Sequence, residues 1–440
     1  MSSGHPGFAQ QVPSRTGRGW VAARPTRRSA LIVAAVAVLT VALPLGVVVP
    51  GLVLCAVVGC ALVDVVVAGR ARPQATRSDV PTLSLRVAVG YSLEAQSSAG
   101  HMARLRQPVP AELEVDPDEV PGASLHGSLL GLHRGTHQLA PAVLRVGGPL
   151  GLGTCDHAVG DAVAVTVMPD LPKARRMADA RRRGRTGEAG RVRTHLGMGT
   201  EFESIRDYTP DDDIRHVNWV ATGRAGRPMA NQFRVDENRE VLCVVDTGRL
   251  MASPVGELTR LDVALDAMTV LAVAAEDSGD RVGAMAFDSR VTRQLAPRRR
   301  GAEALVRALF DLEPSEVESD YERTFAALGR HRRALVALFT DIVDASASRS
   351  LLDASPVLAR RHTVLVASCR DPDLTAAVRS EPQQVKDVLR AAVALELLRA
   401  HDESVARLRA LGVTVVSAPA QQLGPACARA YLRLKQRARL

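Results

Sequence analysis

The longest apolar segment of the chain lies near its N-terminus, where residues 30–63 include no charged side chain. One membrane-spanning helix needs about 20 apolar residues, so this segment is too long for a single span. Residues that end helices or favour turns interrupt it near the middle: Pro44, Pro50 and Gly51. The pattern therefore predicts a transmembrane hairpin within residues 29–69, with helices at about 30–48 and 51–68.

Basic residues at both ends of this segment predict its orientation. Residues 1–28 contain several Arg and no acid, and their composition predicts a disordered arm. Arg70 and Arg72 follow the second helix. Because cytoplasmic flanks are rich in Lys and Arg, we expect a two-span protein of the cell membrane with both termini and the main domains in the cytoplasm. A cleaved signal peptide is the alternative, but a second apolar run directly after the first argues against it.

One acid lies near the end of the second predicted helix. Asp64 is close enough to the helix end to reach the membrane interface, and we expect it there. A functional acid inside the membrane is the alternative, because such residues are costly and mark sites when they occur.

Apolar and polar residues alternate with a period of two over residues 78–170. Strand-like segments such as TLSLRVAVGYSLEA, PAELEVD and DAVAVTVMPD are separated by Pro and Gly. Short strands with turn signals predict a small antiparallel β domain of the β-sandwich type. Its scattered histidines are interpreted as surface residues, with metal ligation as the alternative: His126, His133, His137 and His157.

From residue 236 to the C-terminus the pattern changes to buried strands that alternate with helices. EVLCVVD (240–246) and RALVALFTD (333–341) are nearly continuous apolar runs, and residues 258–277 have a helical pattern between them. Further strand-like segments are RVGAMAF, HTVLVAS and GVTVVSA, with VTRQLAP as an additional candidate. This order predicts an α/β domain of the Rossmann type over 236–440, with a mostly parallel sheet covered on both faces. Ligands of such sheets gather at the carboxyl ends of the strands.

Charge adds two further expectations. The formal net charge is +9, and a basic linker spans residues 171–196. Its basic residues are Lys173, Arg175, Arg176, Arg181, Arg182, Arg183, Arg185, Arg191 and Arg193. The linker fits either a solvated, partly helical connector or a segment that docks onto lipid headgroups or an acidic partner. Nucleic acid is not expected as a partner, because no interleaved aromatic residue or known reading module accompanies the Arg residues.

The cysteines bear on the compartment. The six Cys residues form no CxxC pair and no Cys/His ligand spacing. This usage is typical of isolated thiols in a reducing compartment, which agrees with a cytoplasmic location.

Residues 197–235 have an unusual composition for this chain. They combine Phe, Tyr and Trp with many Glu, Asp and Arg residues, although aromatic residues make up only 3% of the sequence. The order of these residues resembles the signature of the domain-of-unknown-function 58 family. The matching residues are Gly197, Gly199, Glu201, Phe202, Arg206, Tyr208, Asp212, Asp213, Arg215, Asn218 and Trp219. Asp211 stands where the family usually has Gly, and Val220 stands where it often has Lys.

The resemblance implies a fold and a partner. It implies a membrane-anchored protein with a von Willebrand factor A-like domain, often found beside MoxR-type AAA+ ATPases. No settled biochemical activity comes with the family. The segment Gly148–Leu152 resembles, in a weaker form, a turn of the same family.

Von Willebrand A domains often hold a divalent cation, which the resemblance places at three residues here. The ligand positions that survive are Asp246, Thr324 and Asp341. Gly248 and Leu250 stand where the family pattern has hydroxyls, and hard cations such as Mg²⁺ need several oxygen ligands at once. Arg249 adds a competing positive charge. We expect a degenerate site in which the two Asp side chains cap loops or pair with Arg, with Mg²⁺ as the one cofactor that it would take.

The signature segment has two interpretations. In the first, Arg206 and Arg215 bridge to acids while Tyr208 and Trp219 wedge the segment against the α/β domain as a rigid clasp. In the second, its carboxylates act as acid and base: Glu201, Asp207, Asp212 and Asp213. The sequence contains no nucleophile elbow and no phosphate-binding loop of the Walker type, which favours the clasp.

Three functions follow, in order of preference. The first is a non-enzymatic, membrane-anchored adaptor or scaffold in the cytoplasm. The family resemblance makes a MoxR-type AAA+ ATPase its expected partner, in assembly or maturation of an envelope or redox system. The second is a metal-dependent hydrolase that uses the signature acids and the degenerate metal site. The third is a membrane-bound nucleic-acid-binding protein that uses the Arg-rich linker.

Overall fold

The computed structural model describes residues 20–42, 48–80, 82–97, 101–177, 179, 201–209, 212, 214–234, 239–328, 332–342 and 348–436. Among the expected features, residues 1–19, most of the basic linker, Gly197, Gly199, Asp211 and Asp213 lie outside these ranges. The chain divides into two compact units, Met1–Met168 and Pro169–Leu440.

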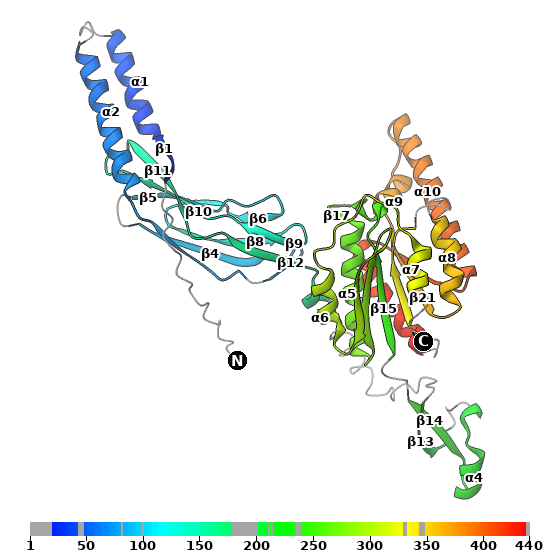
Figure 1. The fold of residues 1–440 in the computed structure, drawn as a ribbon. Helices are drawn as coiled ribbons and strands as arrows, with labels where there is room; N and C mark the ends of the chain where they lie inside the picture. The colour runs from blue at the N-terminus through cyan, green and yellow to red at the C-terminus, as the bar shows by residue number, and fades with distance from the viewer. Residues whose placement is uncertain are drawn as a thin grey trace. The chain divides into compact units, whose positions relative to one another are not determined.

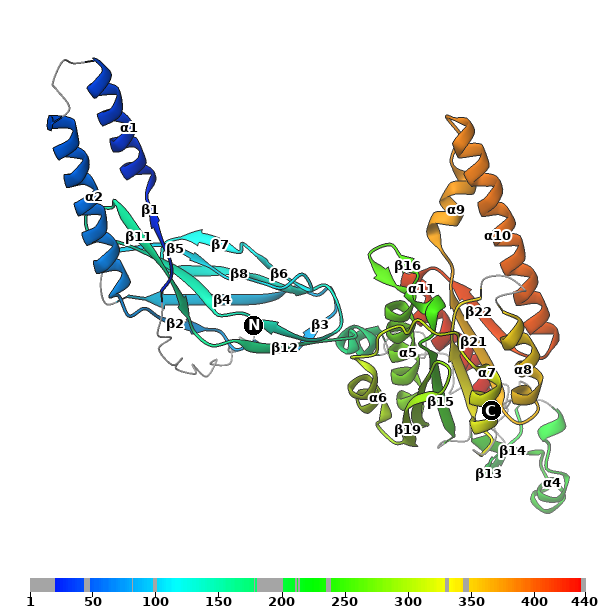
Figure 2. The same cartoon turned by 45° about the horizontal axis from the view of Figure 1, so that its top comes forward.

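The first unit contains two helices that run side by side (Figures 1 and 2). They are α1 (Arg27–Ala42) and α2 (Val48–Gly69). Within the described residues, one helical segment, Gly51–Gly69 of α2, is long and apolar enough to cross a membrane, whereas α1 has 16 residues. Helix α2 begins and ends within three residues of its predicted bounds, whereas α1 begins three residues before and ends six residues before the predicted positions.

The rest of this unit consists of short strands in three sheets. Their bounds are β1 (Trp20–Pro25), β2 (Gln74–Arg77), β3 (Leu83–Ser84), β4 (Val89–Gln96), β5 (His101–Arg106), β6 (Leu113–Asp116), β7 (Glu119–Pro121), β8 (Ser124–Gly131), β9 (Gly135–Leu139), β10 (Ala142–Gly147), β11 (Gly153–Val159) and β12 (Val163–Met168). The sheet orders are β1-β11-β10-β5-β7, β2-β4-β8-β6 and β3-β12-β9. Alternating burial, as in β4 and β6, places one side of each strand in the core, as expected for period-two strands.

Two expectations for this unit are wrong. The arm 1–28 is not disordered throughout, because Trp20–Pro25 forms β1, which pairs with β11 along Trp20–His157 to Pro25–Gly153. His157 is not a surface residue, because it is 5% exposed and its Nε2 lies 2.8 Å from the Ala68 carbonyl oxygen of α2. In both cases the hydrogen-bond partner lies far away in sequence, so no local pattern signals it.

A six-stranded sheet forms the centre of the second unit (Figure 1). Its strands are β15 (Glu240–Asp246), β18 (Arg281–Phe287), β19 (Val291–Arg298), β20 (Leu335–Phe339), β21 (Thr363–Cys369) and β22 (Thr414–Ala418). The order is β19-β18-β15-β20-β21-β22, and all neighbours are parallel except β18 and β19. This is the strand order of a doubly wound α/β fold, whose ligand crevice lies where the order reverses. Here that point lies between β15 and β20.

Helices cover both faces of this sheet (Figures 1 and 2). They are α5 (Arg260–Asp277), α6 (Gly301–Leu309), α7 (Tyr321–Leu328), α8 (Arg349–Ala359), α10 (Val385–Ala410) and α11 (Ala420–Gln436), while α9 (Pro372–Arg379) packs on α10. One cluster of buried side chains joins the sheet to α7, α8 and α10, and includes Phe325, Leu351 and Leu408. Helices α5 and α11 pack together on the other side of the sheet. The mixed α/β architecture is therefore confirmed.

The signature segment forms a small β hairpin with a short helix. The strands β13 (Glu201–Asp207) and β14 (Met229–Arg234) pair in antiparallel register. The connection contains a single-turn 3₁₀ helix, η1 (Ile214–His216), and α4 (Trp219–Ala225). We call residues 201–234 the signature hairpin.

Candidate functional site

Asp246 occupies the carboxyl end of β15, at the point where the strand order reverses. It is 1% exposed, and both carboxylate oxygens accept hydrogen bonds from the protein. The Tyr321 hydroxyl and Thr340 Oγ1 lie 2.6 and 2.7 Å from Oδ2. The Gly248 amide donates to Oδ1 at 2.8 Å, and the Ser319 hydroxyl donates to the same oxygen. Burial and the nearby Asp246 carboxylate raise the pKa of Tyr321 well above its usual value, so the phenol stays protonated and donates.

Ser319 explains one departure from the metal-site pattern. A Cβ atom at Gly248 would overlap the Ser319 hydroxyl. A serine at position 248 would therefore compete for space with Ser319, which reaches Asp246 from a loop 73 residues away in sequence. The hydroxyl that position 248 lacks is supplied by Ser319, and it is used to satisfy the carboxylate.

Asp341 follows β20, the strand that pairs with β15, and it is paired with an arginine. Arg260 Nη1, at the first turn of α5, lies 2.7 Å from Asp341 Oδ1 and donates to the Cys369 carbonyl oxygen at 3.0 Å. Arg260 Nη2 lies 3.7 Å from Asp371, which caps α9. The side chains of Arg260 and Asp341 are 13% and 4% exposed. Burial raises the pKa of Asp341, and the Arg260 charge partly opposes that rise.

The donor set does not fit a divalent cation. Thr324, the expected third ligand, donates its hydroxyl to the Asp320 carbonyl oxygen at 2.8 Å inside the first turn of α7. Arg249, expected beside the site, pairs instead with the exposed Glu318 at 2.8 Å. Within the described residues, no group of three or more His, Cys, Asp or Glu side chains is arranged to hold a metal ion. The positive charge at this edge of the sheet comes from Arg260.

In the signature hairpin, Arg206 and Asp212 form a two-point ion pair. Nη1 and Nη2 of Arg206 lie 2.8 and 2.5 Å from Oδ2 and Oδ1 of Asp212. Thr209 donates its amide and its hydroxyl to the same carboxylate at 2.8 and 2.9 Å. The Arg206 guanidinium holds the pKa of Asp212 well below its usual range. Fork-to-fork geometry of this kind is rigid as well as strong.

Two further signature residues also hold the hairpin together. The Tyr208 hydroxyl donates to the Asp212 carbonyl oxygen at 3.1 Å. Asn218 caps α4 by accepting from the Ala221 amide at 2.9 Å, and its Nδ2 donates to Asn231 Oδ1 at 2.8 Å. The pairing of signature charges expected from the sequence is thus confirmed for Arg206. Thr209 and Asn231 complete the network, and their ordinary hydrogen-bonding side chains gave no distinctive signal in the sequence.

The expected burial of Trp219 is wrong. Trp219 is the first residue of α4 and is 71% exposed, and Val220 and Ile214 beside it are 67% and 69% exposed. The chain around them folds through polar contacts, with Asn218 as the helix cap, so the aromatic ring is not needed as an anchor. Arg215 lies in η1 and is exposed. Glu201 and Phe202 lie on β13, opposite Arg234 and Phe233 of β14.

Comparison with known proteins agrees with the resemblance of the signature residues to the domain-of-unknown-function 58 family. Residues 204–396 match the family described as "Protein of unknown function DUF58". An uncharacterized protein of Mycobacterium tuberculosis and another of Mycobacterium bovis are each 26% identical to the chain over 188 residues. These matches cover 40% of this chain and 58% of each relative. The chain thus spans little more than half the length of the curated relatives that it matches.

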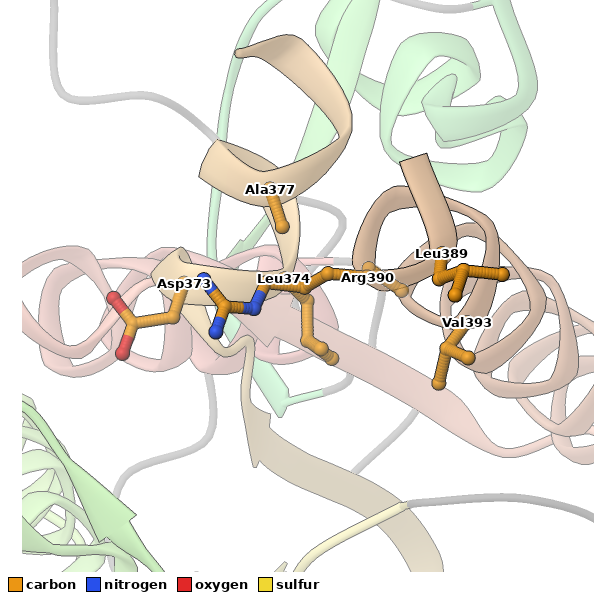
Figure 3. Close-up of a pocket in the computed structure, with 7 residues that line it drawn as sticks. Asp373, Leu374, Ala377, Leu389, Arg390 and Val393 are labelled. Atoms are coloured by element: carbon orange, nitrogen blue, oxygen red, sulfur yellow. The ribbon is translucent and has the colours of Figure 1, made fainter. Parts of the chain in front are cut away.

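The segment that matches the DUF58 family also includes an apolar cleft between α9 and α10. Figure 3 shows Leu374 and Ala377 of α9 near Leu389 and Val393 of α10. The cleft has a volume of about 390 Å³, and Asp373 and Arg390 add one charge of each sign to its lining. Asp371, the cap of α9, joins this helix pair to Arg260 at the end of the sheet.

Proposed function

We propose that this chain is a membrane-anchored adaptor whose cytoplasmic part binds another protein and performs no chemistry itself. In this proposal α1 and α2 form a two-span hairpin, both termini face the cytoplasm, and the second unit is a von Willebrand factor A-like domain. The apolar segment Gly51–Gly69 supports the anchor. The strand order of the sheet and the location of Asp246 at its switch point support the domain type.

The exposed large apolar side chains of the signature hairpin are the observation that carries this proposal. Arg206 and Asp212 pair with each other inside the hairpin, and Tyr208 and Asn218 also make hydrogen bonds there. Three large apolar side chains of the hairpin are exposed: Ile214, Trp219 and Val220. Trp is enriched in the hot spots of protein interfaces, so an exposed Trp on an element that an ion pair holds together supports a protein-binding role.

The partner that we propose is a MoxR-type AAA+ ATPase, acting in the assembly or maturation of an envelope or redox system. This choice rests on the family resemblance, and the match of residues 204–396 to the DUF58 family supports it. The geometry contributes the surface that such a partner would contact.

A metal-dependent hydrolase remains the second candidate, and the geometry at Asp246 counts against it. A catalytic metal needs an open coordination position as well as enough ligands. Each oxygen of Asp246 already accepts hydrogen bonds, and Arg260 covers Asp341. A nucleic-acid-binding role would use the Arg-rich linker, and its binding would weaken steeply with salt.

The first experiment is recovery of the tagged full-length protein from its native membrane with ATP or a slowly hydrolysed analogue. We expect an AAA+ ATPase to co-purify in a nucleotide-dependent way. Trp219→Ala should abolish this recovery while changing the free energy of unfolding by less than about 0.5 kcal/mol, as is usual for an exposed side chain.

Val220→Ser provides a matched pair with Val357→Ser, because the two valines are 67% and 61% exposed and lie on different elements. We expect only the first to weaken partner recovery. Equal recovery with both variants and with Trp219→Ala would refute the role of the hairpin. Metal-dependent hydrolysis by the purified protein would favour the second candidate.

A further inference from the structure

The loop between β10 and β11 is fixed to the side of α2 by one buried acid. Asp64 is fully buried. Its Oδ1 accepts from the Leu150 amide at 3.0 Å, and its Oδ2 accepts from the amides of Leu152 and Gly153 at 2.6 and 3.3 Å. On the other side, Thr26 at the start of α1 donates its hydroxyl to the Gly151 carbonyl oxygen at 2.7 Å. Both helices therefore hold the loop, residues 148–153.

Two glycines allow this close approach. A Cβ atom at Gly148 would lie 2.5 Å from the Asp64 side chain, and one at Gly153 would lie 2.7 Å from Val65 and 2.8 Å from the Ala61 carbonyl oxygen. Real Cβ atoms do not tolerate such distances, so larger residues would push the loop away from α2. The loop thus lies level with Ala61–Val65 of α2.

The exposed apolar side chains of α2 include residues at the level of the loop and extend to Val66. Large apolar side chains are exposed from Val49 to Val66, including Leu62 at 60% and Val63 at 55%. At 1.5 Å per residue, this band is about 26 Å long, close to the hydrocarbon thickness of a bilayer, about 30 Å. The part of α2 beyond the loop, from Val49 to Ala61, is only about 18 Å long. If the whole exposed band from Val49 to Val66 lies in the hydrocarbon, the loop level with Ala61–Val65 lies in it as well.

We propose that residues 148–153 insert into the membrane beside α2, with Leu150 among the lipid chains near the headgroups. Leu150 is 53% exposed at the tip of the loop, and the Arg28 guanidinium lies beside Gly151, where it meets lipid phosphates. This inference rests on the proposed membrane anchor and adds a third membrane contact to it. The β unit is then held at a fixed height on the membrane.

The polar groups at this point satisfy one another, as insertion requires. An unpaired backbone amide in lipid costs several kcal/mol, and an isolated carboxylate is costly there as well. Because three loop amides donate hydrogen bonds to the Asp64 carboxylate, neither the amides nor the carboxylate would be unpaired in the lipid. The role that this assigns to Asp64 is to hold the loop at the membrane.

The test uses full-length protein in vesicles made from equal parts of phosphatidylcholine and phosphatidylglycerol. The exposed Cys55 and Cys60 are replaced by Ala, and Leu150→Cys carries an environment-sensitive fluorophore. Val87→Cys is the matched control, because Val87 is also exposed, at 37%, and follows β3 at the end of the β unit opposite α1 and α2 (Figure 2). Nitroxide-labelled lipids report contact with the chains, and flotation of the same vesicles reports anchoring.

We expect the label at position 150 to be quenched several-fold more than the label at position 87, with a blue-shifted emission. Equal quenching at the two positions in protein that floats with the vesicles would overturn the insertion of the loop and leave the anchor intact. Protein that fails to float would overturn the anchor of the proposed function, and the insertion with it.

Discussion

Arg260 provides the most direct test of how the carboxyl edge of the sheet is stabilised. Replacing it with Met keeps much of the side-chain volume and removes the charge that pairs with Asp341 at 2.7 Å. The Asp341 side chain, 4% exposed, would then be a buried carboxylate without a cation. Breaking a buried ion pair on one side costs about 3–5 kcal/mol.

The lower end of this range is expected for Arg260→Met. Asp341 retains a long hydrogen bond from the Ser368 hydroxyl, at 3.4 Å, and it can take up a proton, because burial already raises its pKa. A loss of about 3 kcal/mol corresponds to a fall in melting temperature of about 6–12 °C for a domain of 150–250 residues. The free energy of unfolding is only about 5–15 kcal/mol in total, so this loss is large.

The assay is thermal unfolding of the full-length protein in detergent. Arg249→Met is the matched control, since Arg249 pairs with Glu318 at a similar distance, 2.8 Å, but the two side chains are 60% and 83% exposed. Exposed pairs contribute about 0–1 kcal/mol. The double variant Arg260→Met/Asp341→Asn should recover more than half of the loss, because no unpaired charge remains. A melting temperature for Arg260→Met equal to that of Arg249→Met would refute the reasoning.

The pH dependence gives an independent check on the same pair. The pKa of Asp341 is raised in the folded state. Between the ordinary carboxyl pKa of about 3.9 and this raised pKa, the folded state therefore binds more protons than the unfolded state. The free energy of unfolding consequently falls as pH rises between these two pKa values. Removing Arg260 raises the pKa of Asp341 further, so the fall should extend to higher pH. We expect the difference between Arg260→Met and the native protein to shrink toward pH 4 and to grow toward neutrality.

Two other ion pairs make further predictions. Lys435 and Asp280 lie 2.7 Å apart, and their side chains are 4% and 0% exposed. Lys435→Met should therefore lower the free energy of unfolding in urea by about 3–5 kcal/mol, while the control Lys386→Met, at an exposed residue of α10, should lower it little. Equal urea midpoints for the two variants would contradict this prediction. In the signature hairpin, Arg206 holds the pKa of Asp212 low, so its stabilisation is present above the ordinary carboxyl pKa and is lost only as pH falls well below it. Hydrogen exchange of the hairpin amides should therefore stay slow down to about pH 4, and it should become fast in Asp212→Asn. Loss of this protection already near pH 6 would show that the Arg206–Asp212 pair is not what protects the hairpin.

The sequence predicted the parts of the fold that have a local pattern. The apolar runs that end at Asp246 and begin at Arg281 are β15 and β18, because buried parallel strands are apolar without interruption. The two helices of the apolar segment were also predicted, since length and Pro residues define them. Both features need only neighbouring residues, so the periodicity is sufficient.

The features that the sequence did not predict depend on contacts between distant residues. Asp64 reaches amides 86 and 88 residues away, and Ser319 reaches Asp246 from 73 residues away. From the sequence we expected a positive charge near the degenerate site and assigned it to Arg249, because that residue is close to Asp246 in sequence. In the structure the cation that pairs with Asp341 is Arg260, at the start of α5. Trp219 was expected to be buried because large aromatics usually are, and its exposure follows from a hairpin that polar contacts hold together.

The polar groups around Asp246 and Asp212 are arranged differently from those of a typical ligand pocket. A ligand or catalytic pocket places a few polar groups so that they converge on an open space. At Asp246 and at Asp212 the polar groups converge on each other, and each carboxylate accepts several protein hydrogen bonds. The large apolar side chains that are most exposed on the described part of the signature hairpin are Trp219, Ile214 and Val220. These exposed apolar side chains are the groups that the proposed protein partner would cover, because desolvation of apolar groups contributes to binding.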